Sequence, residues 1–594
     1  MGLIVQKFGG TSVANSQKIL AAARKAVRAK QEGHQVVMVV SAMGKNTDHL
    51  IDLAHEVNEN PPERELDMLL STGEQVSVAL MAMAINSLGY QAVSLTGGQI
   101  GIRTDSSHTK ARIRSISTER MKKLLDEGNI VIAAGFQGID ENFDITTLGR
   151  GGSDTTAVAL AAVLNADACE IYTDVDGVYT TDPRTLPEAR LMKQVSYDEM
   201  LELASLGAGV MHNRSIEFGK KFDVPIHVRS SFSDNNGSLI VADPEAPDLV
   251  VSGAALTKDE ARITIRHLDD RADVNAELFR PIAENKITVD MIVQNSTGDG
   301  KSDLSFTVPR DEFKKTLKCL QPVVERLGGT LGECSDQVSK LSVVGLGMAR
   351  EVGVATRLFH SLVEAGIHTH MITTSEIKIS VLIERENALV ALRRIHEDFG
   401  LHRSPGNAPK DPFAKLQDRV RDVRPLEVIE RLQGLDMEGL TINDISIDRS
   451  QSRISFLNLP NQLGVIAGIF ESFSQNGFFV DMIVQSYVSP EHVHMSVTVP
   501  KSQYSAAIDL AGELAKQNGA ELSSKESIAK LSVSGIGLRS HTGMAISMFE
   551  AFAANGIVME MLNTSEVRVN AVVDESAGEI ALESLNETFK RVLH

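Results

Sequence analysis

The sequence lacks tryptophan altogether, and aromatic residues make up only 4% of its 594 positions. Cysteine is also scarce. Cys169, Cys319 and Cys334 form no CxxC pair and leave one thiol over, which argues against a disulfide framework and against a zinc site. Basic residues are outnumbered, 59 against 78 acidic ones, and the resulting net charge of −19 argues against a nucleic-acid-binding surface.

Long apolar runs are missing as well. The longest, such as Ala157 to Leu164, are too short to span a bilayer, and the chain already begins with a strand-like segment in place of a signal peptide. We therefore expect a soluble cytoplasmic protein without a membrane partner. The length exceeds the ~250 to 300 residues that one core usually supports, which predicts several domains.

Residues up to about 245 alternate apolar runs with helical segments, a pattern typical of a parallel sheet covered by helices on both faces. Ligands of such sheets gather at the carboxyl ends of the strands. The predicted strands include 35–42, 130–138 and 169–174, and the predicted helices include 71–89 and 153–166.

Beyond Pro244 the chain contains a duplication. The segment VDMIVQ occurs at 289–294 and 480–485, KLSV at 340–343 and 530–533, and TSE at 374–376 and 564–566. Each unit divides again into two modules of strand, helix, strand, strand and helix, and a segment rich in proline and charge separates the units. The predicted ranges are a first domain (1–245), module 1 (246–335), module 2 (336–404), a solvated linker (405–438), module 3 (439–522) and module 4 (523–594).

The stretch KFGGTS follows the first predicted strand and precedes a helix. Backbone N–H groups of Gly9 and Gly10, together with the positive end of that helix, suit phosphate oxygens, and Lys7 adds a full charge. The alternative is that the glycines only close a strand-to-helix turn, with Lys7 pointing to water. Short glycine motifs alone do not decide between the two.

Four further loops follow predicted strands or begin helices. SAMGKNT (41–47) is not a P-loop, because the required glycine is replaced by Val39; STGE (71–74) begins a predicted helix. TTLGRGGSD (146–154) carries Arg150 before a helix capped by Ser153 or Asp154, and TDVDGVYTTDPR spans 173–184. Two glycine loops with one cation each suit a phosphoryl group in transfer, whereas the alternative needs a separate structural reason for every loop.

At these residues the chain resembles the aspartate kinases of the amino-acid kinase family. KFGGTSV, STGE, TTLGRGGSD and YTDVDGVYTTDPR follow the motifs of that family in order, and the modules beyond residue 250 look like ACT domains. The resemblance implies an α/β protein. An amino-acid kinase fold with a mainly parallel sheet would be followed by four ACT modules, ferredoxin-like βαββαβ units, in two pairs.

The resemblance also implies an activity. An aspartate kinase transfers the ATP γ-phosphate to the side-chain carboxylate of L-aspartate, giving 4-phospho-L-aspartate for lysine, threonine and methionine biosynthesis. Mg²⁺ would be held mainly by the ATP phosphates, without a metal site on the protein. A carboxylate with an ordinary pKa of about 3.9 is already ionised at neutral pH, so the nucleophile needs no general base.

Motif position assigns a role to each matching residue. Lys7, Arg150 and Asp154 would act in catalysis, with Lys7 on the transferred phosphoryl group and Arg150 as a two-pronged donor to an aspartate carboxylate. The other substrate-binding residues would be Ser41, Thr47, Glu74 and Ser153, with Glu74 meeting the substrate ammonium. The nucleotide would be bound by Lys7, Gly9, Gly10, Ser12, Thr173, Asp174, Tyr179, Asp182 and Arg184.

One position departs from the family. Many relatives read GAKV with a nucleotide-contacting lysine, whereas this chain reads GAGV with Gly209 in its place. Two alternatives stay open at this point: a kinase of the same fold acting on another carboxylate, and an amino-acid sensor that binds nucleotide without turnover.

The ACT modules imply feedback inhibition by lysine, threonine or both, in a homo-oligomer, with a dimer through the ACT domains expected. Asp273 stands where the third module has Gly464, so the two pairs are expected to differ in ligand or affinity. The alternative is that the modules serve only as oligomerisation surfaces. The expected effector residues are Asp270, Gln294, Thr374, Ser375 and Glu376 in the first pair, and Asn461, Gln485, Thr564, Ser565 and Glu566 in the second.

Overall fold

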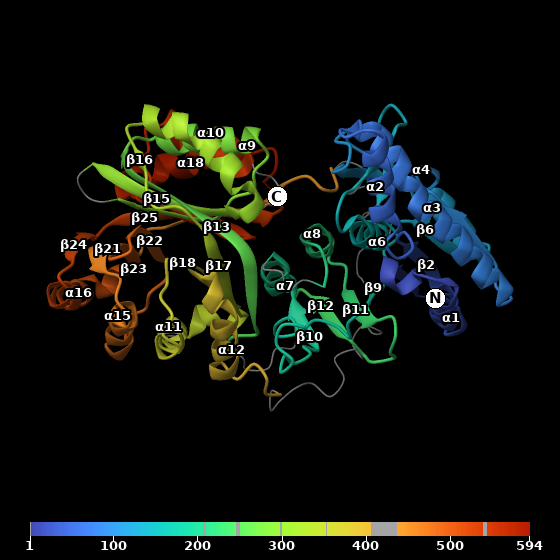
Figure 1. The fold of residues 1–594 in the computed structure, drawn as a ribbon, viewed down its shortest axis with the longest axis horizontal. Helices are drawn as coiled ribbons and strands as arrows, with labels where there is room; N and C mark the ends of the chain where they lie inside the picture. The colour runs from blue at the N-terminus through green and yellow to red at the C-terminus, as the bar shows by residue number, and fades with distance from the viewer. Residues whose placement is uncertain are drawn as a thin grey trace.

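The computed structural model describes residues 2–205, 210–244, 250–296, 300–351, 353–404, 436–538 and 543–593, and only the backbone of 349 and 350. Gly209 and residues 405–435 of the predicted linker lie outside the described residues. Figure 1 shows the amino-terminal domain beside a larger regulatory part formed by the four modules.

An eight-stranded, mainly parallel sheet forms the centre of the amino-terminal domain, as the apolar runs predict. Strands β1, β2, β6, β3, β9 and β11 pair in parallel, while β12 is antiparallel to β11 and parallel to β10. Their order is β10 (Gln194–Ser196), β12 (Ser238–Val241), β11 (Ile226–Ser230), β9 (Ala168–Thr173), β1 (Leu3–Phe8), β2 (Gln35–Val40), β6 (Ile130–Ala134) and β3 (Ala92–Leu95).

Alternating side chains of these strands pack on two helical layers. Met38 and Val40 contribute to a core under α1 (Ser16–Gln31) and α3 (Glu63–Ser87), whereas Val37 and Val39 contribute to the core on the opposite face. The opposite face is covered by α5 (Glu119–Asp126), α6 (Gly152–Val163), α7 (Tyr197–Leu203) and α8 (Asn213–Lys221). The remaining elements are η1 (Gly10–Val13), α2 (Asn46–Val57) and α4 (Gly97–Ile100).

The predicted strand 130–138 is two strands in the structure. Its first half is β6, and its second half is β7, which belongs to a small separate sheet. The chain turns at Phe136, which has a positive φ of 68°, so one strand cannot run through. The small sheet has the order β5 (Ile113–Ile116), β4 (Ile102–Thr104), β7 (Gln137–Ile139) and β8 (Ile145–Thr147).

Helix α3 begins eight residues before Ser71, so the prediction that STGE starts a helix was wrong. Among the described residues, α3 is the one helix whose length and composition would allow a membrane span, although 56% of its apolar window is buried inside the protein. The prediction concerned uninterrupted apolar runs, and α3 contains no such run long enough to span a bilayer. Asp67 and Glu74 interrupt the apolar sequence of α3, yet both side chains are buried.

The strands of the regulatory part form one continuous 15-stranded sheet, and the long strand β13 joins its two halves, here called the two sheets. In each half, modules from different units pair. Strand β14 of module 1 pairs with β26 of module 4, and β18 of module 2 pairs with β22 of module 3. The strands of modules 1 and 2 are β13 (Gly253–Asp269), β14 (Asp290–Ser296), β15 (Lys301–Pro309), β16 (Thr330–Leu331), β17 (Ser335–Val344), β18 (Met371–Ser375) and β19 (Lys378–Glu384). Those of modules 3 and 4 are β20 (Thr441–Asp448), β21 (Gln451–Pro460), β22 (Ile483–Ser489), β23 (His492–Pro500), β24 (Glu521–Lys525), β25 (Ile528–Ile536), β26 (Met561–Thr564) and β27 (Arg568–Asp574).

Two strands complete a neighbouring module. The first part of β13 pairs with β17 of module 2, and β20 pairs with β25 of module 4. A small apolar core that includes Met291, Met371, Met482 and Met561 draws one residue or more from each module, so the two sheets pack face to face.

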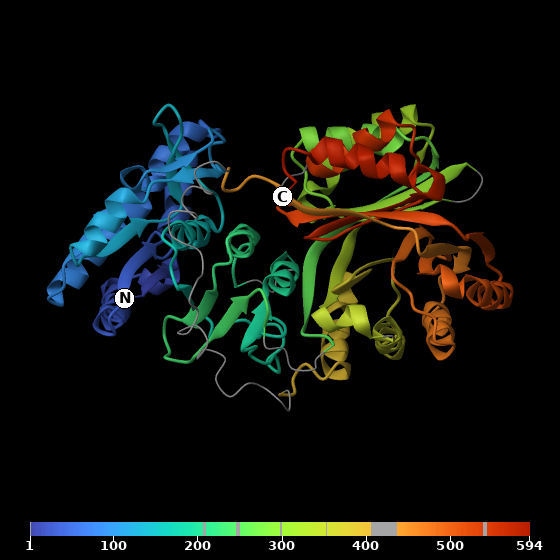
Figure 2. The ribbon, with the colours of Figure 1, turned by 180° about the vertical axis from the view of Figure 1, so that it is seen from behind.

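Helices cover the outer faces of both sheets, above and below the strands in Figures 1 and 2. The cover of modules 1 and 4 consists of α9 (Val274–Glu284), α10 (Phe313–Arg326), α17 (Gly543–Ala554) and α18 (Gly578–Phe589). That of modules 2 and 3 consists of α11 (Val354–Glu364), α12 (Ala388–Asp398), α15 (Val465–Gln475) and α16 (Tyr504–Asn518). Short 3₁₀ turns are η3 (Arg310–Glu312), η4 (Leu346–Arg350), η5 (Arg385–Asn387), η6 (Lys501–Gln503) and η7 (Glu575–Ala577).

Candidate functional site

The central contact of the candidate site joins a strand to a helix. Lys7 lies within β1, not in the turn after it, and its Nζ is 2.5 Å from Oδ1 of Asp154 in the first turn of α6. Both side chains are largely buried, at 12% and 11% exposed. The carboxylate at the helix N-terminus therefore holds the ammonium group at the carboxyl edge of the sheet.

The first glycine loop packs directly on the loop after β2. A Cβ atom on Gly10 would lie 2.8 Å from the carbonyl oxygen of Ala42 and 3.0 Å from that of Gly44. The Gly44 N–H donates to the Gly10 carbonyl oxygen at 3.0 Å, and the Ser41 N–H donates to that of Phe8 at 3.1 Å. Glycine at position 10 has no side chain, so the two loops can pack against each other and form one surface.

Glu74 reaches the same surface from the interior of α3. Its Oε1 accepts the Ala42 N–H at 3.0 Å, while its buried Oε2 has no hydrogen-bond partner in the described structure. Burial raises the pKa of this carboxyl group to about 7, and the hydrogen bond from Ala42 opposes that rise. A buried carboxylate oxygen without a donor suits a cationic ligand group. Thr47 follows Ala42 by five residues in the sequence and lies in the first turn of α2.

The glycine-rich loop before α6 differs from its predicted form in how the helix begins. Gly151, with a φ of 71°, is the N-cap, whereas Ser153 and Asp154 lie inside the first turn. The capping role predicted for these two side chains was wrong, because Asp154 binds Lys7 instead. Ser153 packs on the end of β6, where a Cβ on Gly135 would lie 2.6 Å from its Oγ.

Arg150 lies two residues before that helix and is exposed. Within the described part of the chain, the Arg150 guanidinium forms no ion pair or hydrogen bond with another side chain, in contrast to Lys7. Gly149, with a φ of 74°, makes the turn that precedes it, and a Cβ there would lie 2.9 Å from the Thr109 carbonyl oxygen. The turn thus presents Arg150 on a tightly packed backbone.

The position of this loop depends on Asp67, which the sequence reasoning missed. The carboxylate of Asp67 is fully buried and accepts hydrogen bonds from the Thr109 N–H at 3.0 Å and the Thr147 hydroxyl at 2.5 Å, and it contacts His108 Nδ1 at 2.9 Å. Asp67 and Glu74 are seven residues apart, a spacing that puts them on one face of a helix. The signal was hidden because the predicted helix began only at Ser71.

The predicted nucleotide-binding residues fall into two groups. Ser12, buried in η1, contacts the hydroxyl of Ser231 after β11 at 2.5 Å, a partner that no sequence signal indicated. Thr173, whose hydroxyl donates to Asp174, accepts the Ser231 N–H, so these residues lie together with Gly9 and Gly10.

The second group lies further along the loop that follows β9. Asp182 accepts hydrogen bonds from Arg184, whose Nε is 3.1 Å away, and Tyr179 is half-buried. Thr180 between them contacts His396 Nε2 of α12 at 3.0 Å. This end of the predicted motif therefore lies against module 2, and within the described residues no hydrogen bond or ion pair joins it to Lys7.

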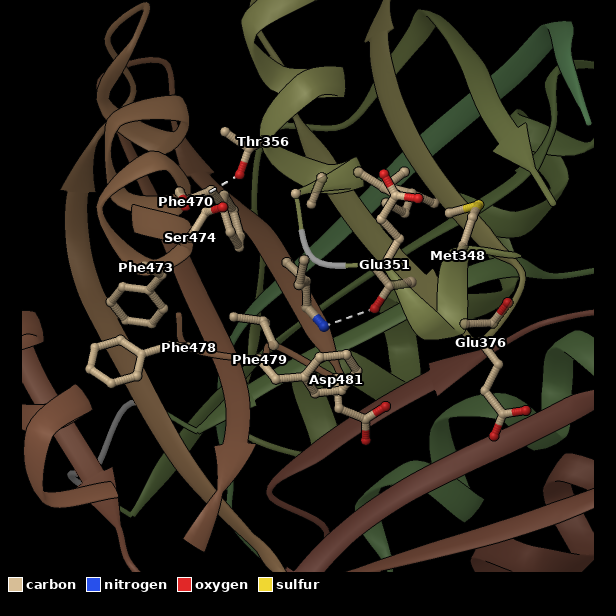
Figure 3. A pocket seen from close by; sticks show the side chains of 18 residues that line it. Met348, Glu351, Thr356, Glu376, Phe470, Phe473, Ser474, Phe478, Phe479 and Asp481 are labelled. Carbon is tan, nitrogen blue, oxygen red and sulfur yellow. Dashed lines mark hydrogen bonds between the residues drawn. The ribbon is translucent and has the colours of Figure 1, made fainter. Parts of the chain in front are cut away.

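Two cavities of the regulatory part are lined by the repeated TSE segments. The larger, of about 270 Å³, lies between modules 2 and 3 and is lined by residues that include Thr374, Ser375 and Glu376. Figure 3 shows phenylalanine side chains of module 3 and acidic side chains of both modules around it. The smaller, of about 80 Å³, lies between modules 1 and 4 and is lined by residues that include Thr564, Ser565 and Glu566.

Because module 1 pairs with module 4 and module 2 with module 3, the predicted effector residues have different neighbours from those expected. Thr374 Oγ1 accepts the Ile483 N–H of module 3 at 2.9 Å, and Gln294 donates to the Met559 carbonyl oxygen of module 4 at 3.4 Å. The expectation that Gln294 accompanies Thr374 was wrong, because sheets join modules of different units. Likewise Gln485 of module 3 donates to module 2 rather than meeting Thr564. Asp270 and Asn461 lie in the loops before α9 and α15.

The second TSE segment and Lys378, which follows the first one, also contact the amino-terminal domain. Lys378, two residues after the first segment, donates to Glu202 Oε2 of α7 at 2.7 Å, in a pair that is almost fully buried. The N–H of Glu566 donates to the other oxygen of Glu202 at 3.3 Å, and Asn213 of α8 donates to the Glu566 carboxylate at 3.1 Å. Burial raises the pKa of Glu202, and the charge of Lys378 opposes that rise.

The described residues contain no group of three or more His, Cys, Asp or Glu side chains that could hold a metal ion. The cations of the candidate site are side chains, Lys7 and Arg150, and its carboxylates, Asp154 and Glu74, lie on different helices. Together with the glycine loops, these cations and carboxylates suit the transfer of a phosphoryl group to an acceptor that has both a negatively and a positively charged group.

Comparison with known proteins first defines the class. The family model of the amino acid kinase family matches residues 2–230, and the ACT domain model matches 341–399 and 531–589. The chain is thus an amino-acid kinase joined to ACT regulatory domains, which confirms the predicted fold class.

Relatives narrow the class. The aspartate kinase of Stutzerimonas stutzeri is 47% identical over 409 residues, which are 68% of this chain and 99% of the relative, and the aspartokinase of Geobacillus stearothermophilus is 48% identical over 402 residues, 68% and 98% respectively. The crystal structure of the aspartate kinase from Synechocystis is 36% identical, covers 99% of this chain and 98% of its own, and has a TM-score of 0.52. The chain belongs to the aspartokinase family.

A more distant structure shares the fold. E. coli aspartokinase III, solved in complex with aspartate and ADP, is 24% identical, covers 67% of this chain and 99% of its own, and has a TM-score of 0.58. This similarity concerns the fold of the two thirds of the chain that it covers.

Replacing Gly10 with alanine tests the contact between the two glycine loops. The added Cβ would press on two carbonyl oxygens, so Gly10→Ala is expected to weaken ATP binding by about tenfold through displacement of the loop. Calorimetric titration with ATP measures this. Gly468→Ala, in α15 where a Cβ meets no atom within 4 Å, serves as the control, and equal affinity in the two variants would contradict a role of the loop in nucleotide binding.

Proposed function

We propose that this protein transfers the γ-phosphate of ATP to the side-chain carboxylate of L-aspartate, giving 4-phospho-L-aspartate. The observation that carries the proposal is the Lys7–Asp154 pair, which lies at the carboxyl edge of a parallel sheet beside two packed glycine loops. The names of the relatives agree with this substrate. The reaction is the first step of lysine, threonine and methionine biosynthesis.

In this proposal the two cations have different tasks. Lys7, held by Asp154, neutralises the charge that spreads over the phosphoryl oxygens during transfer, and Gly9, Gly10 and Ser12 provide the surrounding cradle. Arg150, which is exposed on its loop, forms two parallel hydrogen bonds with a carboxylate of aspartate. The attacking carboxylate is ionised at neutral pH and gives up no proton.

Glu74 and the neighbouring polar residues position the amino acid. The partnerless oxygen of Glu74 accepts a hydrogen bond from the substrate ammonium, and Ser41, Thr47 and Ser153 add hydrogen bonds. Thr173, Asp174, Tyr179, Asp182 and Arg184 border the nucleotide. Mg²⁺ accompanies ATP and is held mainly by its phosphates.

Lysine, threonine or both are the proposed inhibitors. The two TSE segments line the two cavities between modules. Lys378, two residues after the first segment, and Glu566 of the second both contact Glu202 of α7, and Glu566 also binds Asn213 of α8. An amino acid bound between modules can therefore shift the contacts that hold the kinase domain, provided that it binds two arrangements with different affinity. The assembly is proposed to be a homo-oligomer formed through the ACT domains.

Loss of the Lys7 charge tests the reaction itself. Wild-type protein given ATP, Mg²⁺ and L-aspartate is expected to form ADP, and Lys7→Ala is expected to lose more than about a hundredfold in kcat, or roughly 3 kcal/mol of transition-state stabilisation. Lys123→Ala, on helix α5 of the same domain, is the control. A wild-type protein that binds nucleotide without forming ADP would make it a sensor and refute the proposal.

The pH dependence tests the role of Glu74. Because the pKa of its carboxyl group is raised to about 7, Glu74 is protonated below pH 7 and binds the substrate ammonium only above it. Initial rates measured from pH 5.5 to 8.5 are expected to show kcat/KM for aspartate falling about tenfold per unit below pH 7. Glu74→Gln is expected to lower kcat/KM at pH 8 and to remove this dependence; an unaltered profile would contradict the assignment.

Filling the larger cavity tests the regulation. Ser474 of α15 points into the cavity in Figure 3, so Ser474→Trp is expected to raise the half-inhibitory concentration of lysine or threonine by about tenfold or more without changing kcat. The neighbouring exposed position supplies the control, Gln475→Trp. Equal inhibition of both variants would show that neither effector occupies this cavity.

A further inference from the structure

The end of the predicted linker is part of the kinase domain. Residues Asp436 to Gly439, here called the docking segment, lie along β5: the N–H groups of Met437 and Glu438 donate to the carbonyl oxygens of Arg114 and Ile113, at 3.3 and 3.2 Å. Met437 is 1% exposed and belongs to the same apolar core as α6 and α8. The prediction of a solvated linker was wrong for these residues, because Met437 fills an apolar site of another domain.

Glu438 makes the polar part of this contact. Its carboxylate accepts hydrogen bonds from Nε and Nη2 of Arg214, at 2.7 and 2.9 Å, and from the Ile113 N–H at 2.5 Å. The two side chains are 7% and 16% exposed, for Glu438 and Arg214. A two-pronged ion pair of this burial fixes the plane of the guanidinium group.

The remaining donors of Arg214 reach the substrate loop. Nη1 donates to the carbonyl oxygen of Leu148, and Nη2 donates to that of Ala111 at 2.8 Å. Leu148 immediately precedes Gly149 and Arg150, so one guanidinium group joins the docking segment to the backbone that carries Arg150. Lys221 of α8 adds a hydrogen bond to the Gly439 carbonyl oxygen at 3.1 Å.

We propose that Glu438 is a positioning residue for phosphoryl transfer: by orienting Arg214, it holds the glycine-rich loop so that Arg150 can bind the carboxylate of the amino-acid substrate. This inference rests on the proposed function of Arg150. It assigns to a residue of the docking segment an influence on substrate affinity that acts through Arg214 and the glycine-rich loop.

The docking segment also continues straight into the second regulatory unit. Strand β20 begins two residues after Gly439, at Thr441, and pairs along its length with β25 of module 4. Both views of the ribbon show this segment passing from the regulatory part to the kinase domain (Figures 1 and 2). The docking segment therefore gives the second regulatory unit a contact through which it reaches the substrate loop.

The variant Glu438→Gln tests the inference in the full-length protein. It keeps the shape and one acceptor oxygen but removes the charge that orients Arg214. We expect KM for aspartate to rise about tenfold while KM for ATP changes less than about twofold, because only the loop with Arg150 is released. Glu583→Gln, an exposed position on α18 of module 4, is the matched control. Thermal unfolding of each variant reports whether the fold is kept.

A double-mutant cycle separates positioning from a general structural effect. If Glu438 acts through Arg150, then Arg150→Lys and Arg150→Lys with Glu438→Gln have the same KM for aspartate, whereas independent effects would multiply. Multiplying effects, an unchanged KM in Glu438→Gln, or an equal rise in both KM values would each overturn the inference while the proposed function stands. Should Glu438→Gln unfold at a lower temperature, Glu438→Asp, which keeps the charge, is measured in the same cycle. A wild-type protein that does not phosphorylate aspartate would refute the proposed function, and the inference with it.

Discussion

The ion pair between Lys7 and Asp154 is the interaction on which the candidate site depends. It joins the central strand of a parallel sheet to the first turn of the helix that follows the glycine-rich loop carrying Arg150. A mobile ammonium group would neutralise a phosphoryl group only part of the time. A carboxylate at 2.5 Å, in a site little exposed to water, keeps the charge where it is needed.

Support for this site comes from residues that do not touch the proposed substrates. Asp67 binds the backbone and hydroxyl groups on one side of the glycine-rich loop, and Arg214 binds the Leu148 carbonyl oxygen on the other. Neither residue belongs to a glycine motif, yet both determine where the motif lies. The loop is thereby held by α3 and α8, and through Glu438 by a segment from the regulatory part.

Contacts between distant segments of the chain also organise the regulatory part. Its duplicated units do not fold as separate pairs, because each sheet joins a module of one unit to a module of the other. The same arrangement brings Lys378 and Glu566, from equivalent segments of the two units, to one carboxylate of the kinase domain. A buried ion pair that loses its partner is costly, so a change in either unit alters the environment of Glu202. The proposed inhibition can use this contact and the docking segment together.

The sequence by itself determined the alternation of strands and helices in the first domain and the duplication, because apolar periodicity and repeated motifs are local signals. It also predicted the residues of the candidate site, through glycine turns and the resemblance to a known family. It could not show that α3 starts at Glu63, that Thr374 meets module 3, or that Glu438 joins the kinase domain. Those outcomes depend on pairing between segments up to hundreds of residues apart. Only the tertiary structure decided them, since many strands of similar composition could pair, and packing of the shared core selects one arrangement.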